Sequence, residues 1–117
     1  MVRAFLTPAV MASVGFSSPS NAVHLTACGE ASYYEGRTTA SGVLAGAGRA
    51  AHRSLPFGTR LNVTDLDTGR STIVTVADRG PFVGGRIIDL NPRDFAALRQ
   101  LRHGIARVCV AVVSGAS

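Results

Sequence analysis

The feature that most restricts the fold of this chain is a pair of short strand-like segments joined by a tight turn. In residues 59–65, the apolar Leu61 and Val63 alternate with polar neighbours, which is typical of a half-buried strand. Residues 71–77 form the partner segment, and Asp67-Thr-Gly69 supplies the connection. The sequence therefore predicts a β-hairpin in the middle of the chain.

Further short strands are expected on both sides of this hairpin. Residues 31–35, 86–90 and 105–113 have strand character, and the last segment is apolar enough for a central position. Residues 36–51 are rich in Gly, Ala, Ser and Thr without an apolar period, so we expect a long loop there. Several short strands with one helix imply a small mixed barrel rather than a parallel α/β sheet.

One helix is predicted, over residues 92–102. Asn91 is a favourable N-cap, Pro92 suits the first helical position, and Asp94 lies in the first turn. Gly104 is a natural stop for this helix. The residues expected along its apolar side are Phe95, Leu98 and Leu101.

The N-terminus has the organisation of a secretion signal. A charged start (MVR) precedes 13 mainly apolar residues, and a small-residue region follows that ends at Ala22. The apolar stretch is too short, and too interrupted by Pro8, for a transmembrane span. We therefore expect residues 1–22 to direct export to the periplasm or the outside. The alternative is an apolar N-terminus on a cytosolic protein.

The remaining length leaves room for one domain. The chain has 117 residues, and we expect a lead-in over 23–28, the domain over 29–113 and a tail over 114–117. All 12 basic residues are arginine and the net charge is +5, which favours anionic partners such as acidic wall polymers. Because the arginines are scattered along the chain, no specific nucleic-acid site is predicted. We expect a monomer.

Two cysteines, Cys28 and Cys109, lie near the two ends of the expected domain. In an oxidising compartment this arrangement favours one disulfide, worth roughly 2–4 kcal/mol. There is an alternative, because residues 25–28 (LTAC) also fit the lipobox of bacterial lipoproteins, in which the cysteine is acylated. Acylation would make the chain an outer-membrane lipoprotein and leave Cys109 unpaired, so we favour the disulfide.

A family resemblance emerges from several motifs taken in order. They are GEASYY (29–34), TASG (39–42), AAHRSLPFGT (50–59), DRGPF (78–82), GRIIDL (85–90) and GIARV (104–108). This set resembles the rare lipoprotein A (RlpA-like) family over essentially all of residues 29–113. The resemblance implies a mainly β fold, a six-stranded double-psi β-barrel with one short helix.

The resemblance also implies cell-wall chemistry. RlpA-like proteins include septal lytic transglycosylases, carbon–oxygen lyases that cleave peptidoglycan glycan strands to 1,6-anhydro ends and favour strands stripped of their peptides. The same barrel occurs in expansins, which often bind wall polysaccharide without hydrolysing it, and in barwin-like proteins, for which two cysteines are too few. A non-catalytic wall-binding module is therefore the alternative function, since fold alone does not separate the two.

Two residues match the catalytic positions of the family. Asp78, at the start of DRGPF, would protonate the leaving glycosidic oxygen and then act as base. His52, in AAHRSLPFGT, would assist it or hold sugar hydroxyls. The structural alternatives are an Asp78 side chain that caps the following turn and a histidine with a packing role.

Five further residues are candidates for substrate binding. Tyr33 and Tyr34 follow the family's aromatic pair, and strand alternation directs one of them to the core and the other to a sugar. Thr39 and Ser41 offer hydroxyls to the substrate, or merely form a loop. Arg79 would meet polar groups of the substrate, or pair with Asp89.

The chain departs from the family at one site position. Val43 stands where the family's TASG motif continues with a glutamate, and neither Glu30 nor Glu35 has the context to replace it. The loss lowers the expectation of turnover more than that of glycan binding. No metal-ligand spacing or phosphate loop is found in the sequence, and no cofactor is expected.

Overall fold

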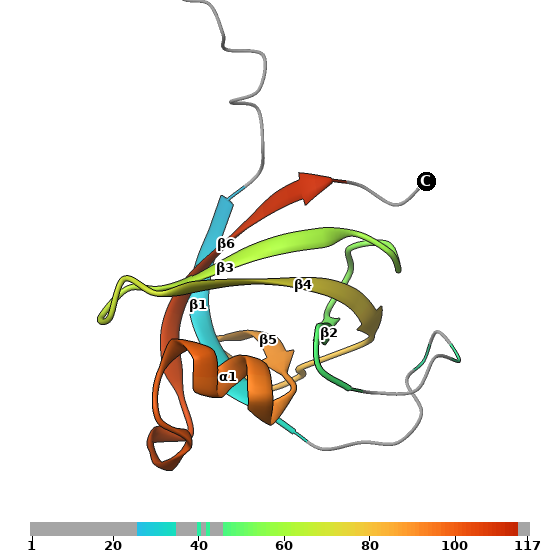
Figure 1. Ribbon diagram of the computed structural model, residues 1–117. Helices are drawn as coiled ribbons and strands as arrows, with labels where there is room; N and C mark the ends of the chain where they lie inside the picture. Colours follow the sequence, from blue (N-terminus) through green and yellow to red (C-terminus); the bar gives the residue numbers. More distant parts are fainter. Residues whose placement is uncertain (1–25, 35–39, 41, 43–45, 115–117) are drawn as a thin grey trace, which may run out of the picture.

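The computed structural model describes residues 26–34, 40, 42 and 46–114 of the chain. The described elements are β1 (Thr26–Tyr33), β2 (Arg49–His52), β3 (Arg60–Asp65), β4 (Ser71–Asp78), β5 (Arg86–Leu90), α1 (Pro92–Leu98), the short 3-10 helix η3 (Leu101–His103) and β6 (Ala106–Ser114). The strands close into a barrel in the order β1-β5-β2-β4-β3-β6 (Figure 1). The prediction of a mainly β, six-stranded barrel with one helix is confirmed.

The predicted hairpin forms the long wall of this barrel. Strands β3 and β4 pair antiparallel, with Leu61 opposite Val74 and Val63 opposite Thr72. On its other edge β3 pairs antiparallel with β6, which in turn pairs antiparallel with β1. Two parallel pairs, β1 with β5 and β2 with β4, make the barrel mixed, and β2 pairs antiparallel with β5 to complete the circuit.

The core follows from the alternation of side chains along these strands. In β3 every second residue is buried, so Leu61 and Val63 point inward while Asn62 and Thr64 remain partly exposed. The inward residues of the strands meet two residues of α1 in one cluster. Its members are Ala31, Ala50, Leu61, Val63, Val74, Val76, Ile88, Leu90, Phe95, Leu98, Ala106, Val108 and Val110.

Helix α1 covers one end of the barrel (Figure 1). It begins as predicted, since the side chain of Asn91 accepts a hydrogen bond from the Arg93 amide and Pro92 opens the first turn. The predicted end at residue 102 is wrong. Arg99 is extended (φ −163°, ψ 170°), which ends the helix at Leu98. No helix in the described part of the chain is long and apolar enough to cross a membrane.

Three expectations about individual elements are corrected by the structure. The first strand spans residues 26–33 rather than 31–35, and the predicted loop over 36–51 contains the start of β2. Leu101 lies in η3 and is 37% exposed, so it does not belong to the apolar side of α1. Strand β2 is short but central, because it lies between β4 and β5 and buries Ala50 and Ala51.

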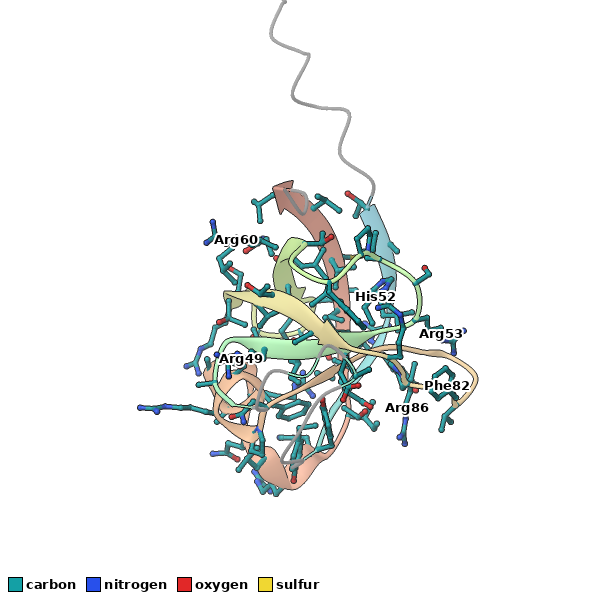
Figure 2. The ribbon with its side chains drawn as sticks, turned by 90° about the vertical axis from the view of Figure 1, so that its right-hand side faces the viewer. Arg49, His52, Arg53, Arg60, Phe82 and Arg86 are labelled. Carbon is teal, nitrogen blue, oxygen red and sulfur yellow. A yellow bond between two sulfur atoms is a disulfide. The ribbon has the colours of Figure 1, made fainter. Side chains whose placement is uncertain are left out.

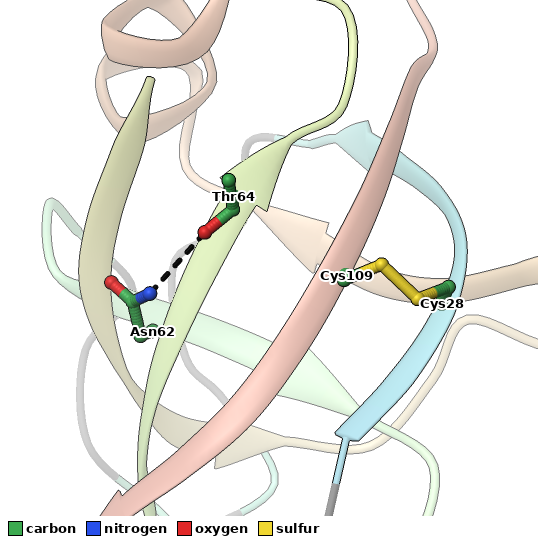
Figure 3. The surroundings of a disulfide bond; sticks show 4 residues. All are labelled: Cys28, Asn62, Thr64 and Cys109. Carbon is green, nitrogen blue, oxygen red and sulfur yellow. Dashed lines mark hydrogen bonds between the residues drawn. A yellow bond between two sulfur atoms is a disulfide. The ribbon is translucent and has the colours of Figure 1, made fainter. Parts of the chain in front are cut away.

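A disulfide joins Cys28 of β1 to Cys109 of β6 (Figure 3), as predicted. The two cysteines face each other in the antiparallel register of these strands, although they are 81 positions apart in the sequence. The bond therefore links the first and last strands of the barrel. It uses the sulfur that acylation of Cys28 would require.

Candidate functional site

Asp78 is the last residue of β4, and both oxygens of its carboxylate accept hydrogen bonds. Its Oδ1 accepts hydrogen bonds from the backbone amides of Ala40 (2.8 Å) and Arg79 (2.9 Å). Its Oδ2 accepts a hydrogen bond from the Tyr34 hydroxyl at 3.0 Å. The side chain is partly exposed. The Arg79 amide contact is the turn-capping bond considered as a structural alternative, but the two other donors come from distant parts of the chain.

Tyr34 is the side-chain partner of this carboxylate. It follows β1 directly, and its backbone amide donates to the Leu90 carbonyl at 3.0 Å. Burial, the hydrogen bond to Asp78 and the negative charges of Asp78 and Asp89 together raise the pKa of Tyr34 well above its ordinary value. The hydroxyl therefore stays protonated and remains a donor to Asp78 over the whole physiological pH range.

Tyr33 has a different environment from Tyr34. Its ring lies against Phe95 of α1, with ring centroids 4.9 Å apart, and its hydroxyl donates to the Leu101 carbonyl at 3.1 Å. The two tyrosines thus diverge as strand alternation requires. Tyr33 packs on the helix side of the barrel, whereas Tyr34 reaches the carboxylate.

A second carboxylate, that of Asp89 in β5, lies close to this group. Ala51 of β2 is the register partner of Asp78 on one side and of Asp89 on the other. Two strand spacings, about 10 Å, therefore separate the two backbones. The Ser32 hydroxyl donates to Asp89 Oδ1, and the Asp89 charge contributes to the raised pKa of Tyr34. The sequence analysis considered Asp89 only as a partner for Arg79.

His52, the last residue of β2, is fixed by its own loop. Its Nδ1 accepts hydrogen bonds from the backbone amides of Ser54 and Leu55, each at 3.1 Å. Burial, followed by the positive charges of Arg79 and Arg53, lowers the pKa of His52 below its ordinary value. The imidazole is therefore neutral at pH 7 and carries its proton on Nε2, from which it can donate to a ligand.

His52 and Asp78 come from neighbouring parallel strands, but no direct hydrogen bond joins them among the described residues. The imidazole lines a cavity of ≈ 190 Å³ whose other walls are mainly apolar. The lining residues are Ala27, His52, Ser54, Leu55, Leu61, Val110 and Val112. Asp78 is not among them, so the carboxylate group and the cavity are separate features of the surface.

Two arginines connect the segment after β2 with the segment after β4. Arg79 Nη1 donates to the carbonyls of Leu55 (2.9 Å) and His52 (3.3 Å), and its guanidinium lies 4.1 Å from the centroid of the Phe57 ring. In the opposite direction, Arg53 donates to the carbonyls of Pro81 and Val83, both at 2.9 Å. No ion pair joins Arg79 to Asp89 in the described part of the chain. Arg79 links the segment after β4 to the segment after β2 by these hydrogen bonds.

Three positions singled out in the sequence, Thr39, Ser41 and Val43, lie outside the described residues. Their neighbour Ala40 is described, and its backbone amide donates to Asp78. Within the described residues, no cluster of three His, Cys, Asp or Glu side chains could hold a metal ion.

Comparison with known proteins agrees with this fold. Residues 26–110 match the family model described as lytic transglycolase. The chain is 47% identical over 88 residues to the probable endolytic peptidoglycan transglycosylase RlpA of Treponema pallidum, covering 70% of this chain and 28% of that protein. It is 42% identical over 102 residues to the protein of the same name from Nostoc, covering 80% of this chain and 28% of the relative.

Solved structures of other proteins share this fold. The apo expansin of Clavibacter michiganensis superposes with a TM-score of 0.64 at 25% identity, over 80% of this chain and 52% of the expansin. The Streptomyces papain inhibitor shares the fold, with a TM-score of 0.63 at 24% identity, over 76% of this chain and 94% of the inhibitor. The barrel, the family model and the RlpA relatives agree, and the chain belongs to the RlpA-like family of lytic transglycolase domains with a double-psi β-barrel.

Proposed function

We propose that this domain cleaves the glycan strands of peptidoglycan as a lytic transglycosylase, with Asp78 as its acid and base. The observation that carries the proposal is the carboxylate of Asp78, which is partly exposed at a strand end and oriented by three donors from three parts of the chain. The relatives named as peptidoglycan transglycosylases support the substrate class. The chain spans about a quarter of the length of these relatives, so the proposal concerns this domain.

The reaction requires one proton donor that later becomes a proton acceptor. Protonated Asp78 gives its proton to the glycosidic oxygen as the bond to the anomeric carbon breaks, which leaves an oxocarbenium-like centre. The carboxylate then takes the proton of the sugar's 6-hydroxyl while that oxygen attacks the same carbon. The product is a 1,6-anhydro sugar and no water is consumed.

Tyr34, Asp89 and His52 have supporting roles in this proposal. Tyr34 remains a hydrogen-bond donor to Asp78 throughout and so keeps the carboxylate in one orientation. Asp89 places a second negative charge near the group. This charge matters because the glutamate that the family has after its TASG motif is replaced by Val43 in this chain. Neutral His52 offers Nε2–H to a sugar oxygen. Electrostatic and positioning effects of this kind account for a large share of enzymatic rate enhancement.

The proposed location of the domain is the periplasm or the outside of the cell. The N-terminal segment has the pattern of a secretion signal, and the disulfide is of a kind that persists in oxidising compartments. Peptidoglycan lies in the same extracytoplasmic space. We therefore predict that residues 1–22 are absent from the exported protein.

A purified domain can test the catalytic proposal directly. Amidase-stripped glycan strands are incubated with the parent protein and with Asp78→Asn, and mass spectrometry is used to search for anhydro-ended fragments. We expect fragments from the parent and a loss of at least about a hundredfold in Asp78→Asn, since acid–base groups contribute roughly 10²–10⁴-fold. Glu30→Gln, which removes an exposed carboxylate of β1, is the matched control and should cleave like the parent.

A wall-binding module without catalysis is the second candidate, favoured by the replacement of the family glutamate by Val43. A further observation in its favour is the likeness to a point mutant of the Clavibacter michiganensis expansin in complex with cellohexaose, with a TM-score of 0.62 at 25% identity over 76% of this chain and 50% of that chain. The same experiment separates the two functions. Strands that are retained by the parent but not cleaved would overturn catalysis and leave binding.

A further inference from the structure

The segment between β4 and β5 presents a large apolar side chain to solvent. Phe82 is 80% exposed and its neighbour Val83 is 53% exposed. Single exposed apolar residues are common on protein surfaces and need no explanation by themselves. Phe82 differs from such residues because the backbone on both sides of it is fixed by hydrogen bonds.

Several bonds hold this segment in place. Arg53 donates from Nε to the Pro81 carbonyl and from Nη2 to the Val83 carbonyl, so one guanidinium spans the residue between them. The Arg86 amide also donates to the Val83 carbonyl, at 3.1 Å. Further along the segment, the Gly85 carbonyl accepts from the Glu30 amide at 2.9 Å. An exposed ring on a backbone held in this way loses little conformational freedom when a ligand binds.

Gly80 contributes to the position of the ring. Its φ of 125° is one that residues with a side chain rarely adopt, and the space where a Cβ would stand is 3.5 Å from Cε2 of Phe82. The ring of Phe82 therefore lies over the backbone of Gly80. Gly80 is two residues from Asp78, and four residues of chain span at most about 14 Å, so Phe82 lies within oligosaccharide reach of the carboxylate.

Positive charge lies beside the ring. Figure 2 shows Arg53, Phe82 and Arg86 along one edge of the molecule, and the hydrogen bonds above place them side by side. The ion pairs found in the described residues all join Asp65 or Asp67 to Arg99 or Arg107, and none of them involves Arg53 or Arg86. Nη1 of Arg53 has no hydrogen-bond partner in the described part of the chain. The nearest acid by register is Glu30, opposite Arg86.

A fixed aromatic face next to a guanidinium fits a sugar that carries a carboxylate. The C–H face of a pyranose packs on an aromatic ring, and a guanidinium binds a carboxylate through charge-assisted hydrogen bonds. In peptidoglycan the muramic acid unit has a lactyl carboxyl group. This group is an anion where the stem peptide has been removed and a neutral amide where the peptide is still attached.

We propose that Phe82 and Arg53 form a subsite for muramic acid units whose lactyl carboxylate is free. The proposal rests on the proposed action on glycan strands, and it identifies the residues that distinguish peptide-free from peptide-bearing strands. Phe82 supplies affinity for the sugar ring. Arg53 supplies the selectivity, because its open Nη1 pairs with the carboxylate and gains much less from an amide.

The test is a binding measurement on two matched ligands. One is a peptide-free tetrasaccharide of alternating N-acetylglucosamine and N-acetylmuramic acid, and the other is the same tetrasaccharide with each lactyl carboxyl converted to its methylamide. Binding is followed by NMR titration in the parent and in Asp78→Asn. The Asp78→Asn variant is included because it cannot consume the ligand by turnover. We expect the free acid to bind roughly ten- to a hundredfold more tightly than the methylamide, as for a hydrogen bond to a charged group.

Variants separate the two roles. Arg53→Gln should reduce the preference for the free acid to about threefold or less, whereas Phe82→Ala should weaken both ligands by roughly three- to tenfold and keep the preference. Arg60→Gln is the matched control, because Arg60 is an exposed arginine of β3 whose loss changes net charge equally (Figure 2). Urea unfolding of each variant shows whether the fold is retained.

The possible results distinguish this subsite from the catalytic proposal. The subsite is overturned if the parent binds the two ligands equally. It is also overturned if Arg53→Gln prefers the free acid over the methylamide as strongly as Arg60→Gln does. Both results count even where anhydro products are formed. A preference that depends on Arg53, in a protein that forms no anhydro product, supports the subsite and overturns catalysis.

Discussion

One ring nitrogen of His52 is hydrogen-bonded to its own loop, and the other remains available to a ligand. Its Nδ1 is occupied by the amides of Ser54 and Leu55, which leaves Nε2–H as the only free polar group of the ring. Both amide bonds require an unprotonated Nδ1. Protonation of His52 would therefore break the two bonds and place a third positive charge near Arg79 and Arg53.

This arrangement predicts a dependence of stability on pH. The pKa of His52 is lower in the folded chain than its ordinary value of 6.5, so the unfolded chain binds the proton more readily. Stability from this group is complete above pH 6.5 and is lost as the pH falls toward the folded pKa. Urea unfolding of the parent should give a lower free energy of unfolding at pH 5.5 than at pH 7.5, and His52→Gln should reduce that difference.

His103→Gln is the control for the pH experiment, because His103 is an exposed residue of η3. It should leave the pH dependence of the parent unchanged. The same slope in the parent and in His52→Gln would contradict the assignment. The carboxylates are the same in the parent and in both variants, so the comparison isolates the effect of the substituted histidine.

Candidate site residues could be proposed from the sequence only where a motif contains them. Asp78 and His52 stand in motifs of the family, and the pairing of Cys28 with Cys109 followed from compartment and count. Asp89 was not predicted as a member of the group around Tyr34. It is 11 positions from Asp78 in the sequence, and only the insertion of β2 between β4 and β5 brings the two acids to either side of Ala51.

At the scale of elements, the turn after β3 is joined to the end of α1 by a buried ion pair. Asp65 is fully buried; its Oδ1 accepts from the amides of Asp67 and Thr68, and its Oδ2 accepts from Arg99 Nε at 2.8 Å. Burial raises the pKa of Asp65, but the hydrogen bonds and charge of Arg99 outweigh it and leave the pKa below its ordinary value. The same arginine is the C-cap residue that directly follows α1.

Removal of this pair should destabilise the fold strongly. Asp65→Asn removes the buried charge partner of the Arg99 guanidinium, which is only 15% exposed and keeps the half-exposed Asp67 as its remaining partner. We expect a loss of about 3 kcal/mol in the free energy of unfolding at pH 7. Because the folded pKa is depressed, the contribution of Asp65 is present above pH 3.8 and is lost as the pH falls through the folded value. The difference between parent and variant should therefore shrink in acid.

Arg107→Ala provides the comparison for this pair. Arg107 is 68% exposed and lies 3.4 Å from Asp67, so its removal should cost less than about 1 kcal/mol in urea unfolding. Similar losses for Asp65→Asn and Arg107→Ala would show that burial of the first pair has no energetic consequence.

Elements with a clear period or cap were predictable, and those defined by their neighbours were not. The hairpin of β3 and β4 follows from alternation and a glycine turn, and the start of α1 follows from Asn91 and Pro92. Strand β2 has four residues, Arg-Ala-Ala-His, and too few positions for a period. Its strand conformation depends on hydrogen bonding to β4 and β5 on both sides, which is a tertiary effect that overrides local propensity.

At the scale of the whole molecule, closure of the barrel depends on the two ends of the domain. Strand β6 lies between β1 and β3, so the last strand in the sequence joins the first strand to the hairpin. The register between β1 and β6 runs from Thr26 opposite Ala111 to Ala31 opposite Ala106, and the disulfide lies within it. Pairing of such distant segments requires loop closure before any contact is gained.

The disulfide should therefore stabilise the barrel without being needed to define it. In the Cys28→Ala/Cys109→Ala variant the six paired positions of β1 and β6 remain, together with the whole core cluster, so the barrel should still form. Loss of a cross-link between residues 81 positions apart should lower the free energy of unfolding by roughly 2–5 kcal/mol, mainly through a less restricted unfolded chain. A reducing agent should lower the urea midpoint of the parent to that of the variant and leave the midpoint of the variant unchanged. Equal midpoints for the oxidised parent and the variant would mean that the ladder of β1 and β6 alone holds the ends together.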